Sequence, residues 1–291
     1  MTTIMRLMPN WTCTRVRAPL VFLLLAALVM PAGAQQQSAP TSSSDTAPTP
    51  PAPISDNSFL VEEAYNQGAG IVQHIGTFRR DRAGGWLATF TQEWPAPSQR
   101  DQLSYTVPLQ SNESSSGLGD VAINYRRQLL GKDEEPIWFS PRLSVILPTG
   151  SVRNGRGAGG PGVQVNFPLS ITVDPGLVTH WNIGGTMTRA RSESGTHGTT
   201  RAVNAAASAI WLATPIFNVM LESAWDRTEM LTAEGVREST DSFVILPGVR
   251  AAINLPSGMQ IVPGIGVPIG VGPSRGERDL FLYLSVEHAF R

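Results

Sequence analysis

Apolar and polar residues alternate strictly along positions 162–173 of the chain. Val163 and Val165 belong to the apolar set, and Gln164 and Asn166 belong to the polar set. A period of two places successive side chains on opposite faces of a β-strand. We therefore predict a strand with one apolar face and one polar face. Soluble sandwiches and membrane barrels both use such strands, so the surroundings of each face decide between them.

The same alternation recurs after residue 70 and predicts about twelve strands, within a range of about ten to fourteen, and no amphipathic helix. The predicted strands lie near 71–80, 86–94, 102–109, 119–130, 136–147, 162–173, 177–189, 201–212, 216–226, 241–254, 259–271 and 279–290. Most have about ten residues, which is the length that a tilted strand needs to cross a bilayer. Pro168 lies near the middle of one strand, and its missing N–H predicts a bulge or an unpaired carbonyl there.

The connections between the predicted strands differ in length in a regular way. Long polar loops are predicted after the third, fifth, seventh and ninth strands, and short turns after the second, sixth, eighth and tenth. Long and short connections therefore gather at opposite ends of the strand array, as they do in up-and-down barrels of the outer membrane. Both chain ends fall on the short-turn side, which fits the same architecture.

The polar faces of the predicted strands carry few charges, and this favours the membrane barrel. Charged residues make up 15% of the chain, against roughly 25% in soluble domains. A soluble sandwich would carry charged side chains on its water-facing side, whereas Gln164, Asn166 and Ser170 are neutral. We therefore predict an all-β fold, an antiparallel up-and-down transmembrane β-barrel. Its apolar face would contact lipid, and its polar face would line the lumen.

Four regions follow one another along the chain. Residues 1–34 combine arginines, an apolar run of about a dozen residues and an Ala-x-Ala site, which predicts a cleaved signal peptide and export. Residues 35–57 are rich in Ser, Thr and Pro and predict a disordered linker. Residues 58–70 fit either a short helix or an extended segment, and we identify them as a candidate plug. Residues 71–291 form the predicted barrel.

Charged residues at lumen-side positions are the candidate functional residues. By strand parity they are Glu93, Asp120, Arg126, Arg142, Glu222, Asp226, Arg250 and Glu287. Both signs are present, so one interpretation is an ionic network that forms a constriction across a narrow pore. The other interpretation is that these charges pair to fill and stiffen the barrel. About twelve strands lie between filled eight-stranded barrels and open sixteen-stranded porins, which predicts a narrow channel for small solutes.

We assign no catalytic or cofactor chemistry to the other motifs. The glycine-rich run 155–160 matches G-x-G-x-x-G but precedes a strand instead of a helix, so we interpret it as a loop. The four histidines lack metal-ligand spacing, and the single cysteine, Cys13, lies in the predicted signal peptide. His180 on a polar face leaves a barrel hydrolase as an alternative. We predict no enzymatic activity, no cofactor and no metal.

Four stretches carry a resemblance to a known family. They are SFLVEEAYNQGAGIVQH (58–74), FTQEWP (90–95), GLGDVAINYRRQLL (117–130) and PRLSVILPTGS (141–151). In them, and along the chain after the linker, the sequence resembles the family called MetA-pathway of phenol degradation. This resemblance implies an outer-membrane β-barrel transporter associated with the uptake of aromatic compounds. It implies no catalytic residues.

We therefore expect a barrel of the Gram-negative outer membrane through which small solutes, aromatic or hydrophobic ones included, diffuse passively. The alternative is a structural or adhesive barrel with a closed lumen. Expected partners are outer-membrane lipids, a small-molecule solute, and the barrel-assembly machinery, which would recognise the C-terminal strand with Phe290 next to its last residue. A formal net charge of −1 argues against a nucleic-acid partner.

Overall fold

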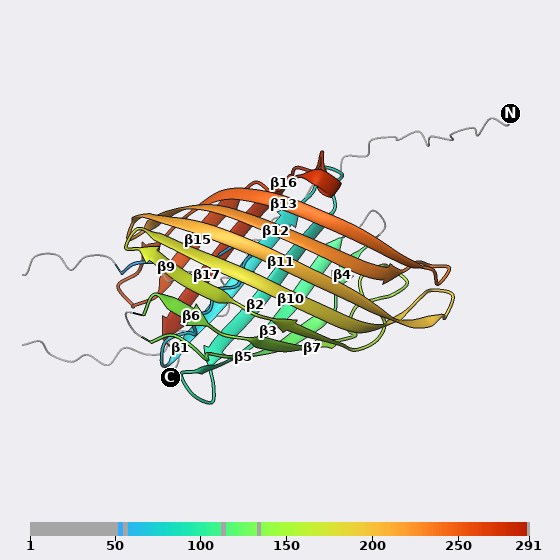
Figure 1. Cartoon of the computed structure of the whole chain (residues 1–291), viewed down its shortest axis with the longest axis horizontal. Helices are drawn as coiled ribbons and strands as arrows, with labels where there is room; N and C mark the ends of the chain where they lie inside the picture. The colour runs from blue at the N-terminus through green and yellow to red at the C-terminus, as the bar shows by residue number, and fades with distance from the viewer. Residues whose placement is uncertain (1–51, 55–57, 112–114, 133–134, 290–291) are drawn as a thin grey trace, which may run out of the picture. The chain divides into compact units, whose positions relative to one another are not determined.

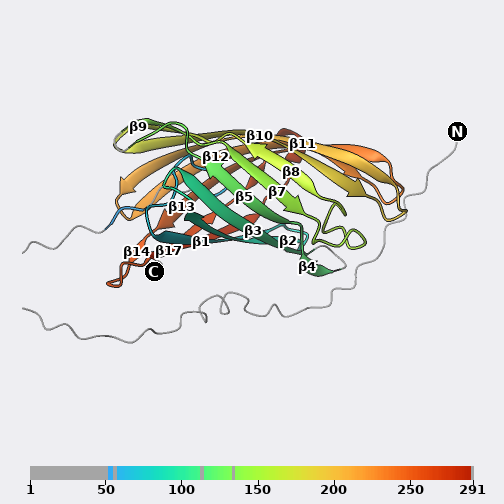
Figure 2. The same ribbon diagram turned by 90° about the horizontal axis from the view of Figure 1, so that it is seen from below.

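The computed structural model describes residues 52–54, 58–111, 115–132 and 135–289, which belong to one compact unit, Pro50–Arg291. The predicted signal peptide and most of the predicted linker lie outside the described residues. Figures 1 and 2 show, from two perpendicular views, strands that run obliquely around a common wall. None of the described residues belongs to a helix that is long and apolar enough to span a membrane.

The strand segments of this unit form a single sheet of 17 segments. They are β1 (Ile71–Arg80), β2 (Trp86–Pro95), β3 (Asp101–Ser111), β4 (Ser116–Leu118), β5 (Val121–Arg127), β6 (Ile137–Phe139), β7 (Arg142–Leu147), β8 (Gly162–Asn166), β9 (Leu169–Asp174), β10 (Leu177–Arg191), β11 (His197–Thr214), β12 (Phe217–Leu231), β13 (Arg237–Ala251), β14 (Ile253–Asn254), β15 (Gln260–Gly266), β16 (Ile269–Gly270) and β17 (Leu280–Ala289), with the 3-10 turn η2 (Gly272–Ser274) before the last strand. β1 pairs antiparallel with both β2 and β17. Because the last strand pairs with the first, the sheet forms a closed barrel without a free edge.

Five pairs of these segments are halves of one longer strand. β4 and β5, β6 and β7, β8 and β9, β13 and β14, and β15 and β16 each continue along the wall after a short interruption. The wall therefore consists of 12 antiparallel strands. This confirms the predicted all-β, antiparallel barrel and its strand number, and each wall strand overlaps one of the predicted segments.

Pro168 separates β8 from β9 without a bulge. Asn166 pairs with Gly184 of β10, and Leu169 pairs with Trp181 of the same strand, so the register is unchanged across the proline. The register with the neighbouring β6 and β7 is equally continuous. The predicted bulge is therefore wrong. Proline has no N–H to donate to the ladder, and the strand continues past Pro168 without a change of register.

The outer face of the wall is apolar, and the inner face carries the alternating polar set. In β8, β9 and the link between them, Val163 and Phe167 are 51% and 42% exposed, whereas Asn166 and Ser170 are 5% and 0% exposed. Other strands repeat this arrangement, and Trp181 is 50% exposed on the outer face of β10. A closed wall with an apolar exterior satisfies its backbone internally and suits a lipid environment.

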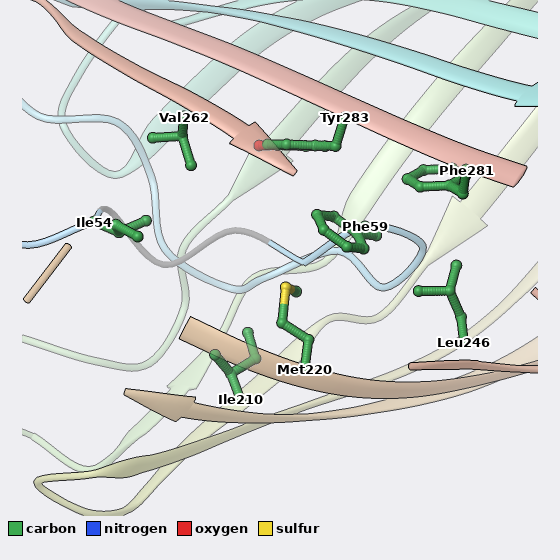
Figure 3. Close-up of a cluster of buried hydrophobic side chains, with 8 residues drawn as sticks. All are labelled: Ile54, Phe59, Ile210, Met220, Leu246, Val262, Phe281 and Tyr283. Atoms are coloured by element: carbon green, nitrogen blue, oxygen red, sulfur yellow. The ribbon is translucent and has the colours of Figure 1, made fainter. Parts of the chain in front are cut away.

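One side of the barrel interior is apolar. Figure 3 shows a buried cluster of side chains at this side: Ile54, Phe59, Ile210, Met220, Leu246, Val262, Phe281 and Tyr283. Six of the eight come from the inner face of the wall between β11 and β17, and two come from the chain before β1. The expectation that polar residues line the whole lumen is therefore wrong for this side.

Two hairpins, β10–β11 and β12–β13, extend beyond the neighbouring strands at one end of the barrel (Figure 1). β10, β12 and β13 have 15 residues each, and β11 has 18. The sequence predicts long loops near 190–200 and 227–240, but most of both ranges is strand. The prediction fails because strand residues outside a bilayer need no apolar face, so the alternation that identifies a strand disappears.

Candidate functional site

Residues 58–70, called the inner segment from here on, lie inside the barrel. The segment contacts every one of the 12 wall strands. One contacting residue from each strand, in order, is Gln73, Glu93, Gln102, Arg126, Arg142, Ser170, Asn182, Ser208, Glu222, Gly248, Gly264 and Tyr283. A short segment can reach all the strands of a closed barrel only from its interior.

Glu62 joins the inner segment to several wall strands at once. Its Oε1 lies 3.3 Å from Arg126 Nη1, and its Oε2 lies 2.8 Å from Arg142 Nε. The side chain of Asn166 donates to the same Oε2 at 2.8 Å. The backbone N–H of Glu62 donates to Asn182 Oδ1 at 2.8 Å, and its carbonyl accepts from Asn182 Nδ2 at 2.7 Å. The wall therefore compensates both the charge and the backbone of Glu62.

Arg126 holds three of the four residues that follow Glu62. It is 2% exposed, and its Nη1 donates to the carbonyl oxygen of Glu63 at 2.9 Å. Its Nη2 donates to the carbonyl oxygen of Tyr65, and its Nε donates to Asn66 Oδ1 at 3.2 Å. Because a guanidinium presents its donors in a rigid fork, these bonds fix the path of the backbone as well as its charge.

Burial and the nearby arginines act differently on the two adjacent carboxyl groups of the inner segment. Burial raises the pKa of Glu62, but Arg142 and Arg126, with a hydrogen bond from Asn166, outweigh burial and hold this pKa below its usual value of 4.5. Burial also raises the pKa of Glu63, and Arg126 offsets only part of this effect, so this pKa lies above 4.5. The docked segment therefore favours an ionised Glu62 and a protonated Glu63.

One carboxylate and one aromatic cluster hold the beginning of the inner segment. Glu222 accepts hydrogen bonds from the N–H groups of Phe59 at 2.7 Å and Leu60 at 2.6 Å. The Phe59 ring lies 5.4 Å from the ring of Phe281 and 5.2 Å from the ring of Tyr283, measured between centroids (Figure 3). These contacts attach the segment to β12 and β17 on the apolar side of the interior.

Two glycines of the wall make room for the Phe59 ring. A Cβ atom at Gly248 or at Gly264 would lie 2.6 Å from ring carbons of Phe59. This is much shorter than the 3.5–4.0 Å at which carbon atoms pack. Glycine at both positions therefore lets the ring approach the backbone of β13 and β15.

The last part of the inner segment is held by neutral and acidic side chains on the other side of the barrel. The N–H of Gln67 donates to Gln102 Oε1 at 2.8 Å. The Nε2 of Gln67 lies 2.5 Å from Gln73 Oε1 and 3.2 Å from Glu93 Oε1. The N–H of Ala64 donates to Ser170 Oγ at 2.8 Å. Polar docking therefore extends from Ser58 to Gln67.

The structure brings four of the eight predicted lumen-side residues into hydrogen-bond contact with the inner segment: Glu93, Arg126, Arg142 and Glu222. Glu287 is linked indirectly, since it accepts a hydrogen bond from Gln73 at 2.8 Å. Arg250 is 1% exposed and lies on the inner face of β13. Asp226 accepts a hydrogen bond from Thr228 at 3.3 Å and is absent from the contacts of the inner segment among the described residues. Glu93, Arg126, Arg142 and Glu222 therefore bind the inner segment.

Asp120 lies outside this group and anchors a loop. Its Oδ1 accepts from the N–H of Gly150, and its Oδ2 accepts from the N–H of Ala158, both at 2.8 Å. Thr149 Oγ1 donates to the carbonyl of Gly119 at 2.7 Å. The GLGD stretch at 117–120 and the LPTG stretch at 147–150 are thus hydrogen-bonded neighbours, which gives both motifs of the family resemblance a structural role.

Ser170 and His180 are adjacent in the interior. Ser170 Oγ lies 2.7 Å from His180 Nδ1, and both residues are 0% exposed. The ring of Tyr65 lies 5.9 Å from the ring of His180. The inner segment therefore covers this pair. In the part of the chain that the structure describes, no three His, Cys, Asp or Glu side chains gather as a metal site requires.

Glu62 and Asn182 make central contacts that the sequence alone did not predict. Glu62 and Glu63 are adjacent acids within a stretch that has no lysine or arginine, and two arginines, Arg126 and Arg142, are predicted to face the lumen. This charge complementarity was the available signal. Asn182 had no such signal, because a neutral side chain on a polar strand face resembles its neighbours.

Comparisons with known proteins agree with the fold. No protein-family model matches the chain, and no curated protein matches it. A solved structure of the NanC porin is similar, with a TM-score of 0.51 and 9% sequence identity over 76% of this chain and 99% of that chain. The COG4313 outer membrane channel from Pseudomonas putida F1 is similar with a TM-score of 0.55 and 9% identity over 78% of this chain and 98% of that chain. This chain therefore has the fold of outer-membrane channel barrels, as the family resemblance implied.

Proposed function

We propose that the protein is an outer-membrane channel through which small solutes diffuse passively, and that the inner segment is a plug that narrows its lumen. The observation that carries this proposal is the contact of residues 58–70 with all 12 wall strands. A barrel needs no internal segment to be stable in lipid, because its wall satisfies its own backbone. The inner segment is held in the lumen by ionised and neutral polar groups, and its role in this proposal is to restrict the passage of solutes.

The outer membrane is the proposed location. The exterior of the wall is apolar, and the barrel fold is the one that outer-membrane channels use. The short turns and the paired ends of β1 and β17 would face the periplasm, and the long hairpins would face the outside. Export through the predicted signal peptide, residues 1–34, is part of this proposal.

The proposed solutes are small, and aromatic or hydrophobic compounds are among them. The family resemblance implies aromatic solutes, and the buried cluster around Phe59, Phe281 and Tyr283 supports an apolar side of the pathway. Passage along this side would require the Phe59 ring to move, since it fills the space next to Gly248 and Gly264. The plug would therefore set the rate of diffusion.

We propose no catalytic role for the Ser170–His180 pair. Ser170 Oγ accepts a hydrogen bond from the N–H of Ala64 and also contacts His180. The side chains of Ser170 and His180 are both fully buried. A nucleophile needs access to substrate and a nearby group that stabilises the developing charge. The pair would instead help to dock the inner segment.

The C-terminal strand is the proposed recognition element for the barrel-assembly machinery. β17 places apolar residues such as Leu282 and Leu284 on the outer face and pairs with β1 to close the wall. Replacing Leu282 and Leu284 with Asp should abolish insertion in cells, measured as loss of heat-modifiable migration on a gel. Normal insertion of this variant would contradict the assignment.

The channel is tested by liposome swelling and by planar-bilayer conductance with purified, refolded protein. We expect slow swelling with arabinose for the natural chain and faster swelling for Glu62→Gln, whose plug has lost its charge pairing. Glu193→Gln, in an exposed turn, is the matched control and should behave like the natural chain. A correctly inserted barrel that shows no flux and no conductance with either glutamate variant would overturn the proposal.

A further inference from the structure

A cavity of about 870 Å³ opens at the end of the barrel that lies opposite Ile71 and Ala289. Its lining comes from the β1–β2 turn, the ends of β2 and β3, the loop before β8 and the loop before β17. Within the part of the chain that the structure describes, none of the 12 wall residues named above as contacts of the inner segment belongs to this lining. The cavity is therefore a separate site at the outer mouth of the proposed channel.

The cavity faces the barrel interior. Arg79 pairs with Leu87 across β1 and β2, and Leu87 pairs with Gln110 across β2 and β3, so the three side chains share one face of the wall. On the other side of β1, Arg79 pairs with Phe281, which belongs to the buried cluster inside the barrel. These residues form one inward row, and Phe281 in this row contacts the Phe59 ring.

The described lining is rich in arginine. It contains five arginines, Arg79, Arg82, Arg156, Arg275 and Arg278, and three carboxylates, Asp81, Glu277 and Asp279. The lining therefore carries two more positive than negative charges. In a chain with a formal net charge of −1, this concentration of positive charge is local. Arginine at a partly enclosed mouth focuses the field and attracts anions.

Two of the three acidic groups of the lining pair with Arg79. Arg79 Nε lies 2.6 Å from Asp279 Oδ2, and Arg79 Nη2 lies 4.0 Å from Glu277 Oε2. Asp81 Oδ1 accepts a hydrogen bond from the N–H of Gly85 at 2.9 Å. Arg79 therefore uses its charge within the wall and leaves the other arginines to act on a ligand.

Three arginines are directed to solvent at this mouth. Arg82, Arg275 and Arg278 are exposed, and none of them forms an ion pair with another residue in the described part of the chain. Guanidinium groups bind carboxylates through two parallel hydrogen bonds, which selects planar anions. Leu87, which is 39% exposed, lies beside these groups in the same cavity and provides apolar surface.

The geometry points to a binding site for small organic anions, a carboxylate on an apolar body, at the outer mouth. Arg82, Arg275 and Arg278 bind the carboxylate, and Leu87 contacts the apolar body. This inference rests on the proposed channel function, because it names the class of solute that the mouth collects. Phosphate groups of lipids share the anionic chemistry, but the inward row of Arg79, Leu87 and Gln110 favours a solute that enters the barrel.

The test is isothermal titration calorimetry with sodium benzoate at low salt, on protein refolded in a non-ionic detergent. The detergent removes lipid headgroups as a competing source of anions. The triple variant Arg82→Gln, Arg275→Gln and Arg278→Gln should weaken benzoate binding by about tenfold or more, since each lost charge-assisted contact contributes about 1.5 kcal/mol or more. Inorganic phosphate should bind more weakly than benzoate.

The matched control is the triple variant Arg100→Gln, Arg201→Gln and Arg237→Gln. It removes the same number of positive charges at positions outside the cavity lining. It should bind benzoate as the natural chain does. No benzoate binding by the natural chain, or equal weakening in both triple variants, would overturn the inference. Phosphate binding as tight as benzoate would overturn the apolar contact. Binding is measured without transport, so a failure of conductance would overturn the channel function alone.

Discussion

Glu62 of the inner segment and Arg142 of β7 form an ion pair inside the barrel, with 2.8 Å between Oε2 and Nε. The two residues are 80 positions apart in the chain, and neither is strongly exposed. The same glutamate also pairs with Arg126 of β5. One carboxylate therefore pairs with a buried and a part-buried cation of neighbouring strands, and its loss would remove this counter-charge from Arg142 and leave Arg126 paired with Glu63.

Glu62→Gln should open the lumen. Removing one partner of a buried charge pair costs about 3 kcal/mol or more, because the remaining charges stay buried. A loss of about 3 kcal/mol in docking raises the population of the undocked segment roughly a hundredfold. Single-channel recordings should show longer and more frequent open events. An unchanged record would mean that Glu62 does not control docking.

Conductance should depend on pH through the two glutamates of the inner segment. The pKa of Glu62 is lowered in the docked state, so its contribution to docking is present above about 4.5 and is lost as the pH falls through the docked pKa. The pKa of Glu63 is raised, so Glu63 weakens docking as the pH rises above 4.5. Conductance should therefore be lowest near pH 4.5 and rise on both sides.

The two limbs of this pH profile can be separated by substitution. Glu62→Gln should remove the increase on the acid side, and Glu63→Gln should remove the increase on the neutral side. Arg126 and Arg142 face these carboxyl groups and keep their charges in both variants. A profile with the same two limbs in both variants would show that other groups of the wall set the pH dependence.

Gly248→Ala should displace the Phe59 ring. The added Cβ would lie 2.6 Å from a ring carbon, so either the ring or the strand must shift. We expect conductance to increase at least about twofold, as docking weakens by about 1 kcal/mol or more. Phe59→Ala in the same chain should remove the effect of the alanine. Gly185→Ala is the control, since its Cβ would meet nothing closer than 3.5 Å.

Asp120→Ala should release the loop before β8 without changing the plug. The carboxylate accepts two backbone hydrogen bonds from this loop, and their donors would lose their partner. Limited trypsin digestion of the folded protein should then cut after Arg153 or Arg156 at least about tenfold faster. Asp174→Ala, which removes one hydrogen bond from a short turn, is the control. Equal cleavage of both variants would contradict the anchoring role.

The wall could be predicted from the sequence because its physics is local. A period of two depends only on neighbouring residues, and it correctly separates Val163 and Phe167 from Asn166 and Ser170. The same parity directs Arg126 and Arg142 to the interior. The sequence shows that Pro168 lies within a strand but does not show its effect. That effect depends on which carbonyl of a neighbouring strand loses its hydrogen-bond donor.

The contacts of the inner segment could not be predicted in the same way. Glu62 reaches Arg126, Arg142 and Asn182 across 64 to 120 positions of the chain, and a local pattern does not encode such pairs. The apolar side of the interior was missed for a related reason. Inner positions such as Ile210 and Met220 interrupt the alternation, and only the position of Phe59 explains why they are apolar.

The pairing of β17 with β1 constrains the order in which the protein can assemble. The inner segment precedes β1 directly, and both of its flanks are tied to the wall, through Ile54 to the carbonyl of Pro215 and through Gln67 to β3. Once the last strand has joined the first, no lateral route into the barrel is left. The segment can take its position while the sheet is still open, and it can then act as a template around which the remaining strands curl; afterwards it can leave and return only through an end of the barrel.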